Sequence, residues 1–211
     1  MKSTFEIKNR VLIAYKGNDT VVRVPHGVRI IGQNAFRDCV SVTSIRLPRS
    51  VTTICECAFF GCSSLREIVL SAKLSVVRKD AFAHCKMLET MVFPKRLTSL
   101  SSAFEGCEAL SLLCFKGKHT IYLGKGVFSG VSSSLCVQFG GSASVWESMT
   151  SSRNATGEYI SMGEFERGRE FPLYHATYGE GFRLTVYCGK SEVPLLQNGT
   201  SHDFAEWRPY F

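Results

Sequence analysis

Three cysteines lie within eight residues of this chain, in the segment CECAFFGC at positions 55–62. Closely spaced thiolates bind zinc or exchange disulfides, so the segment is a candidate for metal or redox chemistry. The chain of 211 residues contains nine cysteines. Because nine is odd, complete internal disulfide pairing is excluded, and mostly reduced, buried thiols are favoured. Whether the segment is reactive or structural depends on the elements that position it.

The cysteine segment is one copy of a repeat. The copies are GQNAFRDC (32–39), CECAFFGC (55–62), RKDAFAHC (78–85), LSSAFEGC (100–107) and the divergent GKGVFSGV (124–131). Their phenylalanines are spaced 23, 23, 22 and 24 residues apart, and further apolar positions keep the same period. A unit of about 23 residues cannot bury its own apolar face. We therefore predict a solenoid of about five rungs stacked around one continuous core.

Each rung is predicted to contain a strand and a turn. The segment I-x-L-P alternates with period two, which predicts a short strand ended by a proline such as Pro48. The segment A-F-x-x-C predicts one helical or 3-10 turn. Gly32 precedes the first of these turns, and its column predicts tight or left-handed backbone. Since Cys55, Arg78 and Ser101 stand in that column elsewhere, we expect the turn to differ between rungs.

These columns resemble the BspA-like (Treponema-type) leucine-rich repeat family over residues 22–131, and residues 135–149 are similar to a segment that follows the family's last repeat. The resemblance implies a leucine-rich-repeat solenoid, mainly β with short helical or 3-10 turns. An N-terminal β-hairpin cap is expected in residues 1–21 and the solenoid in residues 22–149. Residues 150–211 form an irregular or β extension, which either caps the last rung or is a separate small β module.

No catalytic residue, metal ligand or cofactor site is predicted. Cys39, Cys62, Cys85 and Cys107 share one repeat column, so they form a linear ladder that cannot converge on one ion. Cys55 and Cys57 stand in columns that are polar in other rungs, so we expect them near the surface. They are separated by one residue, whereas zinc motifs use two to four. The histidines show no metal-binding spacing, and no nucleophile motif occurs.

One predicted binding surface is the outward face of the strands, where alternate residues point to solvent. Its residues are Arg23, Ser44, Arg46, Glu67, Val69, Thr90, Val92, Leu112 and Cys114. The Arg23 end is basic, and the Val69–Cys114 end is apolar. An exposed apolar stripe indicates either a partner surface or coverage by the C-terminal part of the chain. The third interpretation is that β-branched residues simply suit strands.

A second predicted surface is a basic edge just after the strands, formed by His26, Arg49, Lys73, Lys95 and Arg96. One cation per rung suits an acidic partner or successive phosphates. The alternative is a solvated face that protects strand edges. The net charge of +7 is spread along the sequence and demands neither nucleic acid nor an acidic partner.

The sequence therefore predicts a non-catalytic module that presents its repeats to a protein partner. The resemblance implies surface adhesion or host interaction. The alternatives are polyanion or nucleic-acid binding through the basic edge, or a purely structural domain of a larger assembly. No apolar run is long enough for a membrane span. The start of the chain shows no signal peptide, which favours the cytoplasm, whereas the resemblance favours the cell surface or secretion.

Overall fold

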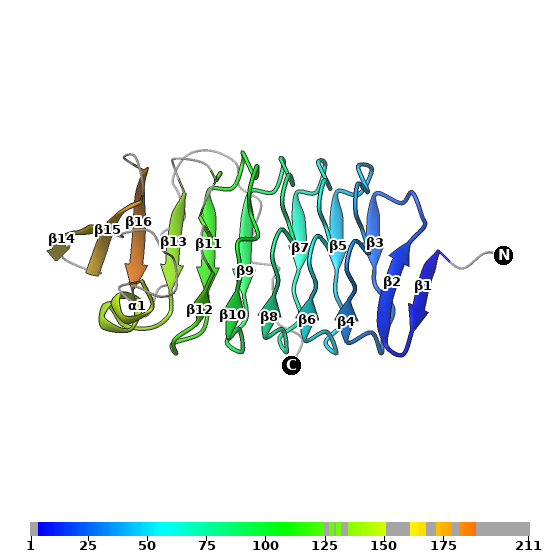
Figure 1. Ribbon diagram of the computed structural model, residues 1–211, viewed down its shortest axis with the longest axis horizontal. Helices are drawn as coiled ribbons and strands as arrows, with labels where there is room; N and C mark the ends of the chain where they lie inside the picture. The colour runs from blue at the N-terminus through cyan, green and yellow to red at the C-terminus, as the bar shows by residue number, and fades with distance from the viewer. Residues whose placement is uncertain are drawn as a thin grey trace, which may run out of the picture.

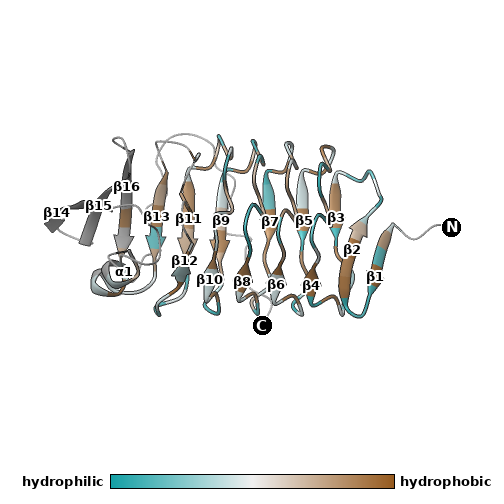
Figure 2. Cartoon of the chain, in the orientation of Figure 1, coloured by the Kyte–Doolittle hydropathy of each residue, from teal (hydrophilic) through white to brown (hydrophobic). Residues whose placement is uncertain are grey.

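Each repeat contributes two short strands, and strands of successive repeats lie side by side along the long axis of the molecule (Figure 1). The computed structural model describes residues 4–124, 127–128, 130–131, 135–150, 161–167, 172–178 and 182–188. Hydrophobic residues concentrate in the strands, for example β4, β8 and β11 (Figure 2). The fold is a β-solenoid with little helix, which confirms the predicted fold class. Within the described ranges, no helix is long and apolar enough to cross a membrane.

One face of the solenoid is a seven-stranded sheet in the order β1-β2-β4-β6-β8-β10-β12. Its strands are β1 (Phe5–Lys8), β2 (Val11–Tyr15), β4 (Ile30–Ile31), β6 (Thr53–Ile54), β8 (Val76–Val77), β10 (Ser99–Leu100) and β12 (Tyr122–Leu123). β1 and β2 pair antiparallel as a hairpin, and β2 then pairs parallel with β4. The hairpin thus continues the sheet at the N-terminal end.

The opposite face contains two sheets. A three-stranded sheet holds β3 (Val21–Arg23), β5 (Ser44–Arg46) and β7 (Glu67–Val69). A six-stranded sheet holds β9 (Thr90–Phe93), β11 (Leu112–Phe115), β13 (Cys136–Phe139), β16 (Phe182–Cys188), β15 (Pro172–Tyr178) and β14 (Ser161–Arg167) in that order. Neighbouring repeats pair in parallel with equivalent positions opposed, as in Ile45↔Ile68. β7 and β9 belong to successive rungs but lie in different sheets, so the ladder on this face is interrupted between them.

A column of aromatic rings runs through the core. Tyr15, Phe36, Phe59, Phe82 and Phe104 stack in sequence, with ring centroids 5.1, 5.1, 5.2 and 5.8 Å apart. The four phenylalanines are fully buried. Because the stack crosses every rung interface in this part of the solenoid, neighbouring rungs supply the apolar contacts that one rung lacks.

The C-terminal end of the solenoid is closed by α1 (Ala143–Thr150). The Ser142 hydroxyl accepts a hydrogen bond from the Val145 amide at 3.4 Å, so Ser142 acts as the N-cap. Trp146 is fully buried on this helix, with its ring 5.4 Å from Phe139. β16 pairs parallel with β13, and the antiparallel strands β15 and β14 follow. The predicted extension therefore continues the six-stranded sheet over its described strands, while residues 151–160 and 189–211 lie outside the description.

Among the described residues, left-handed backbone occurs at two positions of the first three repeat turns and at one position of the fourth and fifth, and neither position is the column of Gly32. The first position has φ of 58° at Asn34, 54° at Cys57 and 54° at Asp80. The second comprises Asp38, Gly61, His84, Gly106 and Gly130, with φ of 57°, 71°, 60°, 70° and 68°. Of the two alternatives predicted for the Gly32 column, left-handed backbone does not occur at Gly32. A Cβ there would lie 2.5 Å from the Leu12 carbonyl oxygen, so this glycine permits close approach to β2.

The third rung keeps its shape although Ser71 replaces the proline found in the first, second and fourth rungs. Ser71 is buried; its hydroxyl donates to the Arg49 carbonyl oxygen at 3.0 Å and accepts from the Lys73 amide at 3.1 Å. The Leu74 amide donates to the Ser71 carbonyl at 3.0 Å, as the Val51 amide does to Pro48 in the rung before. The serine thus holds by hydrogen bonds the turn that proline holds by its fixed φ.

Candidate binding surfaces

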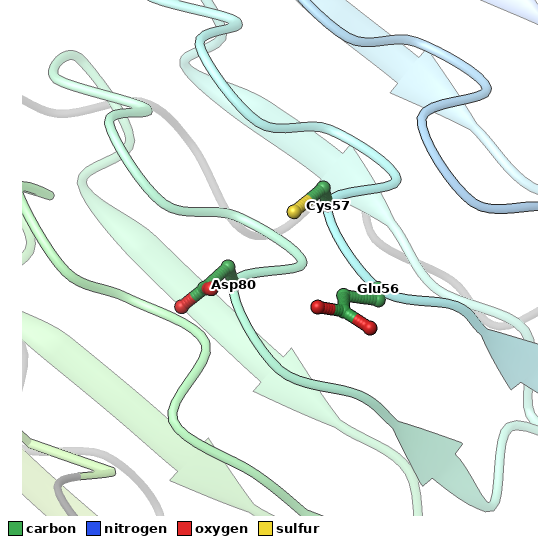
Figure 3. Close-up of side chains that lie close together, drawn as sticks. All are labelled: Glu56, Cys57 and Asp80. Atoms are coloured by element: carbon green, nitrogen blue, oxygen red, sulfur yellow. The ribbon is translucent and has the colours of Figure 1, made fainter.

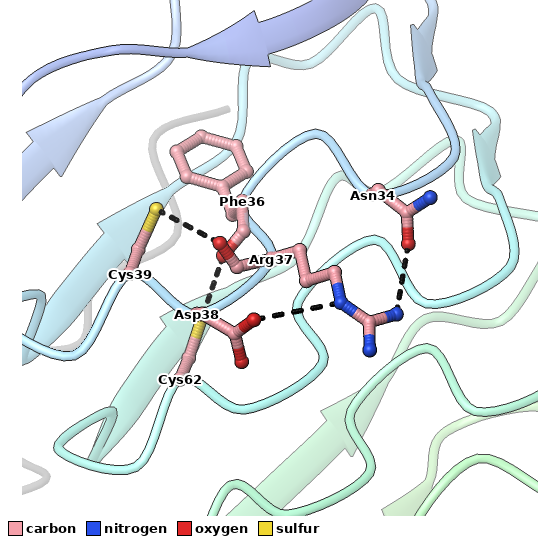
Figure 4. A network of polar contacts seen from close by, with 6 residues as sticks. All are labelled: Asn34, Phe36, Arg37, Asp38, Cys39 and Cys62. Carbon is pink, nitrogen blue, oxygen red and sulfur yellow. Dashed lines mark hydrogen bonds and ion pairs between the residues drawn. The ribbon is translucent and has the colours of Figure 1, made fainter.

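The cysteine column is a structural feature of the core. The thiols of Cys62, Cys85 and Cys107 are fully buried. They donate to the carbonyl oxygens of Phe36, Phe59 and Phe82 in the preceding rungs, at Sγ–O distances of 3.1, 3.2 and 3.0 Å. The first of these bonds is drawn in Figure 4. Burial raises the pKa of Cys107 to about 12, so this thiol is un-ionised and a poor nucleophile at neutral pH.

Cys39, the first member of the column, differs from the others. It is partly exposed, and its thiol lies 3.9 Å from the Arg37 carbonyl oxygen within its own turn (Figure 4). The hairpin before it contributes no Ala-Phe turn whose carbonyl this thiol could reach. Burial raises the pKa of Cys39 to about 11 even so. The column as a whole forms the predicted ladder, without ligands converging on one point.

The structure pairs Cys57 with carboxylates rather than with Cys55. Glu56, Cys57 and Asp80 offer three ligand atoms within 4.8 Å of one another, on turns of two successive rungs (Figure 3). Burial, followed by the charges of Asp80 and Glu56, raises the pKa of Cys57. The Lys79 ammonium lies 3.7 Å from the Asp80 carboxylate. A single thiol whose thiolate is disfavoured, beside an exposed glutamate and a paired aspartate, matches neither a zinc thiolate site nor an all-oxygen site.

A surface contact that the sequence did not predict crosses three rungs next to these turns. The Arg37 guanidinium lies 4.3 Å from the centroid of the Phe60 ring, and the Phe60 ring meets His84 edge-on at 5.0 Å. Arg37 also contacts Asp38 at 3.5 Å and donates to the Asn34 side chain at 3.3 Å (Figure 4). Arg37 and Phe60 occupy the same repeat column, 23 residues apart, and this shared column is the feature from which the sequence could have predicted their contact.

The outward strand face places the predicted residues in register. Arg23 lies opposite Arg46, Arg46 opposite Val69, and Val92 opposite Cys114. Arg23, Arg46, Glu67 and Val92 are exposed, with Val92 at 37% exposure, whereas Ser44, Val69, Thr90, Leu112 and Cys114 are partly buried. Gln138, the next outward position after Cys114, is only 3% exposed. The accessible part of this face therefore lies on β3, β5, β7 and β9.

Coverage of this face by the C-terminal part of the chain was one sequence interpretation. The described strands β14–β16 extend the edge of the six-stranded sheet beyond β13. Residues 189–211 lie outside the part of the chain that the structure describes, so the interpretation that they cover the strand face is not tested.

The basic edge has a groove of about 660 Å³. Its lining residues are Arg29, Thr52, Lys73, Ser75, Lys95, Arg96, Thr98 and His119. Of the predicted edge residues, Lys73, Lys95 and Arg96 line the groove, whereas His26 and Arg49 do not. Arg29 and His119 were not predicted from the sequence as part of the basic edge. The repeat offered a signal for Arg29, because Arg29, Thr52, Ser75 and Thr98 follow the buried residues Val28, Val51, Leu74 and Leu97 at a 23-residue spacing.

Three hydroxyl groups that line the groove already donate hydrogen bonds within the protein. Thr52, Ser75 and Thr98 donate to the carbonyl oxygens of Arg29, Thr52 and Ser75, at 3.3, 3.1 and 3.1 Å. One His119 ring nitrogen, Nε2, lies 2.8 Å from the Leu97 carbonyl oxygen. Since a carbonyl only accepts, Nε2 carries the hydrogen and Nδ1 is the nitrogen left for a ligand.

Comparison with known proteins places the repeat pattern in context. The sequence pattern of the BspA type leucine rich repeat region matches residues 14–149, in six copies. A leucine rich cell surface protein from Faecalibacterium prausnitzii shares 28% identity and a TM-score of 0.62, over 69% of this chain and 40% of that one. The pneumococcal vaccine antigen PcpA shares 18% identity and a TM-score of 0.51, over 72% of this chain and 45% of its own.

A third solved structure, a Treponema pallidum leucine rich repeat protein, shares 25% identity and a TM-score of 0.48, over 63% of this chain and 77% of its own. The likeness to PcpA is one of fold alone. A comparison with curated proteins gave no match. The chain spans less than half the length of the Faecalibacterium protein, of which 40% is covered.

Proposed function

The chain belongs to the BspA-type leucine-rich repeat family, and from that premise we propose that it is a non-catalytic module that binds a protein partner at a cell surface, in adhesion or host contact. The similar Faecalibacterium protein is described as a cell surface protein, which supports the compartment. The raised pKa of Cys57 and Cys107 supports the absence of thiol catalysis, because both thiols are poor nucleophiles at neutral pH.

The outward strand face is the observation that carries this proposal. Arg23 lies opposite Arg46 and Arg46 opposite Val69, and the second apolar residue, Val92, lies on β9 of the next rung. Val92 is 37% exposed although it lies in the middle of a strand. Apolar side chains flanked by arginine are the composition that protein interfaces favour over the remaining surface. We assign the partner's first contacts to these four residues, with Ser44, Glu67 and Thr90 beside them.

The area of this face sets a condition on the partner. Four strands about 4.8 Å apart span roughly 15 Å, so the outward residues alone offer far less than the roughly 800 Å² that a stable interface buries on each side. A tight partner therefore also contacts the flanking segments. We propose residues 1–21 as the N-terminal cap and residues 150–211 as a C-terminal extension whose strands β14–β16 widen the surface.

The proposal is tested with the double variant Val69→Glu, Val92→Glu. Wild-type protein is immobilised, surface proteins of the native host are passed over it, and the retained proteins are identified by mass spectrometry. The double variant should lose the proteins that wild type retains, because two carboxylates are placed in the apolar contact. The matched control is Val40→Glu, Met87→Glu, at 57% and 37% exposed positions on the repeat turns, which should retain them.

Thermal melting of both variants completes the experiment. If the Val69, Val92 variant melts like wild type and still captures the same proteins, this face is not the partner surface. If it unfolds while the control variant does not, the valines are covered within the chain, and the proposal fails in favour of coverage by the C-terminal part.

A further inference from the structure

Positive charge is distributed unevenly between the two edges of the solenoid. The loops that join the two faces after β3, β5, β7, β9 and β11 contain Arg29, Arg49, Lys73, Lys95, Arg96, Lys116 and Lys118, and no aspartate or glutamate. These seven cations equal the net charge of +7 of the whole chain, so the remainder is formally neutral. A bias that is dispersed in sequence is therefore concentrated in space, because positions 23 residues apart become neighbours.

The opposite edge, formed by the Ala-Phe turns, is balanced. It holds Asp38, Glu56, Asp80, Glu89, Glu105 and Glu108. Four of these carboxylates pair with cations of the same edge: Arg37 with Asp38, Arg66 with Glu89, Lys79 with Asp80 and Lys86 with Glu108, at 3.5, 3.7, 3.7 and 3.1 Å. Within the described residues, Arg29, Lys73, Lys95 and Arg96 form no ion pair. Among the described residues of the two edges, the basic edge therefore carries the larger excess of positive charge.

We propose that the groove on this edge binds a linear acidic polysaccharide, sulfated or carboxylated, laid across the rungs. The groove reaches from Arg29 in the first rung to His119 in the fifth. At about 4.8 Å per rung, that is a track of roughly 19 Å. Because the cations are spread along a track rather than gathered around one point, the groove suits a chain of anions better than a single ion.

The lining identifies the class of polymer. The edge loops contain no phenylalanine, tyrosine or tryptophan, whereas single-stranded nucleic acids are held by aromatic side chains on which bases stack. All eight lining residues are polar or charged, so an acidic peptide would find no apolar anchor pocket. Neutral hydroxyl groups beside lysine and arginine suit a ligand whose units carry hydroxyls between anionic groups.

This inference goes beyond the proposed protein-binding face. The groove residues lie in the edge loops, whereas Val69 and Val92 lie in strands on the opposite face from the seven-stranded sheet. The two proposals can therefore fail separately: the valine variants should bind polysaccharide normally, and the groove variants should capture protein partners normally.

The test measures binding of heparin, as the sulfated probe, to the full chain by calorimetry from 0.05 to 0.3 M salt. The groove variant is Lys73→Gln, Lys95→Gln, Arg96→Gln. The matched control, Arg66→Gln, Arg78→Gln, Lys86→Gln, removes the same charge from the opposite edge. Each neutralised anion contributes roughly 0.7–0.9 to the slope of log K against log salt. The groove variant should therefore lose about 2 from the slope and at least about 10-fold in affinity near 0.1 M salt.

The control variant should change affinity by less than about 3-fold, since none of its three residues lines the groove and two of them, Arg66 and Lys86, already pair with carboxylates. Equal losses in the two variants would overturn the proposal in favour of net charge alone. A single-stranded oligothymidylate that binds as tightly as heparin, with the same loss in the groove variant, would overturn the polysaccharide assignment in favour of a polyphosphate. Failure of wild type to bind heparin at 0.05 M salt would overturn the site altogether.

Discussion

Replacing Phe59 by alanine tests the stacked core most directly. Phe59 is fully buried, and its ring lies 5.1 Å from Phe36 and 5.2 Å from Phe82, nearly parallel to the latter at 4°. Truncating a buried phenylalanine costs about 3–5 kcal/mol through lost transfer energy and the remaining cavity. Aromatic pairs add about 0.5–1.5 kcal/mol each beyond burial, and both pairs are lost. We expect Phe59→Ala to lower the free energy of unfolding by at least about 4 kcal/mol.

The neighbouring Phe60 provides the control, since it is the same residue type in the same turn but is partly exposed. Its contact with the Arg37 guanidinium, 4.3 Å from the ring centroid, is worth about 0.5–1 kcal/mol at such a site. Phe60→Ala should therefore cost no more than about 1.5 kcal/mol. Urea unfolding is followed by circular dichroism and by the fluorescence of the buried Trp146. A loss below about 1 kcal/mol for Phe59→Ala, or equal losses for both variants, would refute the stacked-core reasoning.

Three further predictions concern the turns and the thiol ladder. Burial raises the pKa of Cys107 from 9.0 to about 12, so this thiol ionises in the unfolded chain at a lower pH than in the folded protein. The free energy of unfolding should therefore fall as pH rises from 9 to about 12. In urea titrations, Cys107→Ala should make this pH dependence weaker. Cys57→Asn places at φ 54° a residue that tolerates left-handed backbone, so melting should show unchanged or slightly higher stability, whereas a clear loss would contradict this account. Ser71→Ala removes two hydrogen bonds of a buried hydroxyl and should cost about 1–2 kcal/mol by urea unfolding; an unchanged stability would show that the bonds contribute nothing.

The repeat columns were sufficient to predict the solenoid, because each column has one physical requirement. A large apolar ring at Phe36 and Phe59 and a small residue at Ala35 and Ala58 are needed for neighbouring rungs to stack, and all four are buried. The turn backbone was harder to predict. Gly32 was interpreted through its conformational freedom, yet what it provides is the absence of a side chain beside β2. Glycine satisfies both needs, so its identity alone does not separate them.

The binding surfaces were predicted only in part. Alternation along a strand fixes which residues point outward, and Arg23, Arg46 and Val92 are indeed exposed. Alternation says nothing about the flanking strands, which is why the burial of Gln138 at the next outward position was not anticipated. The groove depends on where loop side chains from five rungs meet. The column of Arg29 repeats a position, with Thr52, Ser75 and Thr98, but not a charge, so a search for repeated cations did not find Arg29.

The interrupted ladder between β7 and β9 has a mechanical consequence. When a chain is pulled by its two ends, the rungs of a solenoid part by breaking the hydrogen bonds that adjacent rungs share. The third and fourth rungs share the β8–β10 pair and the bonds between their turns, such as that from the Ser101 amide to the Val77 carbonyl, but no pair between β7 and β9. We therefore expect this interface to yield before its neighbours under tension. The molecule should then extend in two steps, with the rungs on either side of the interface intact after the first.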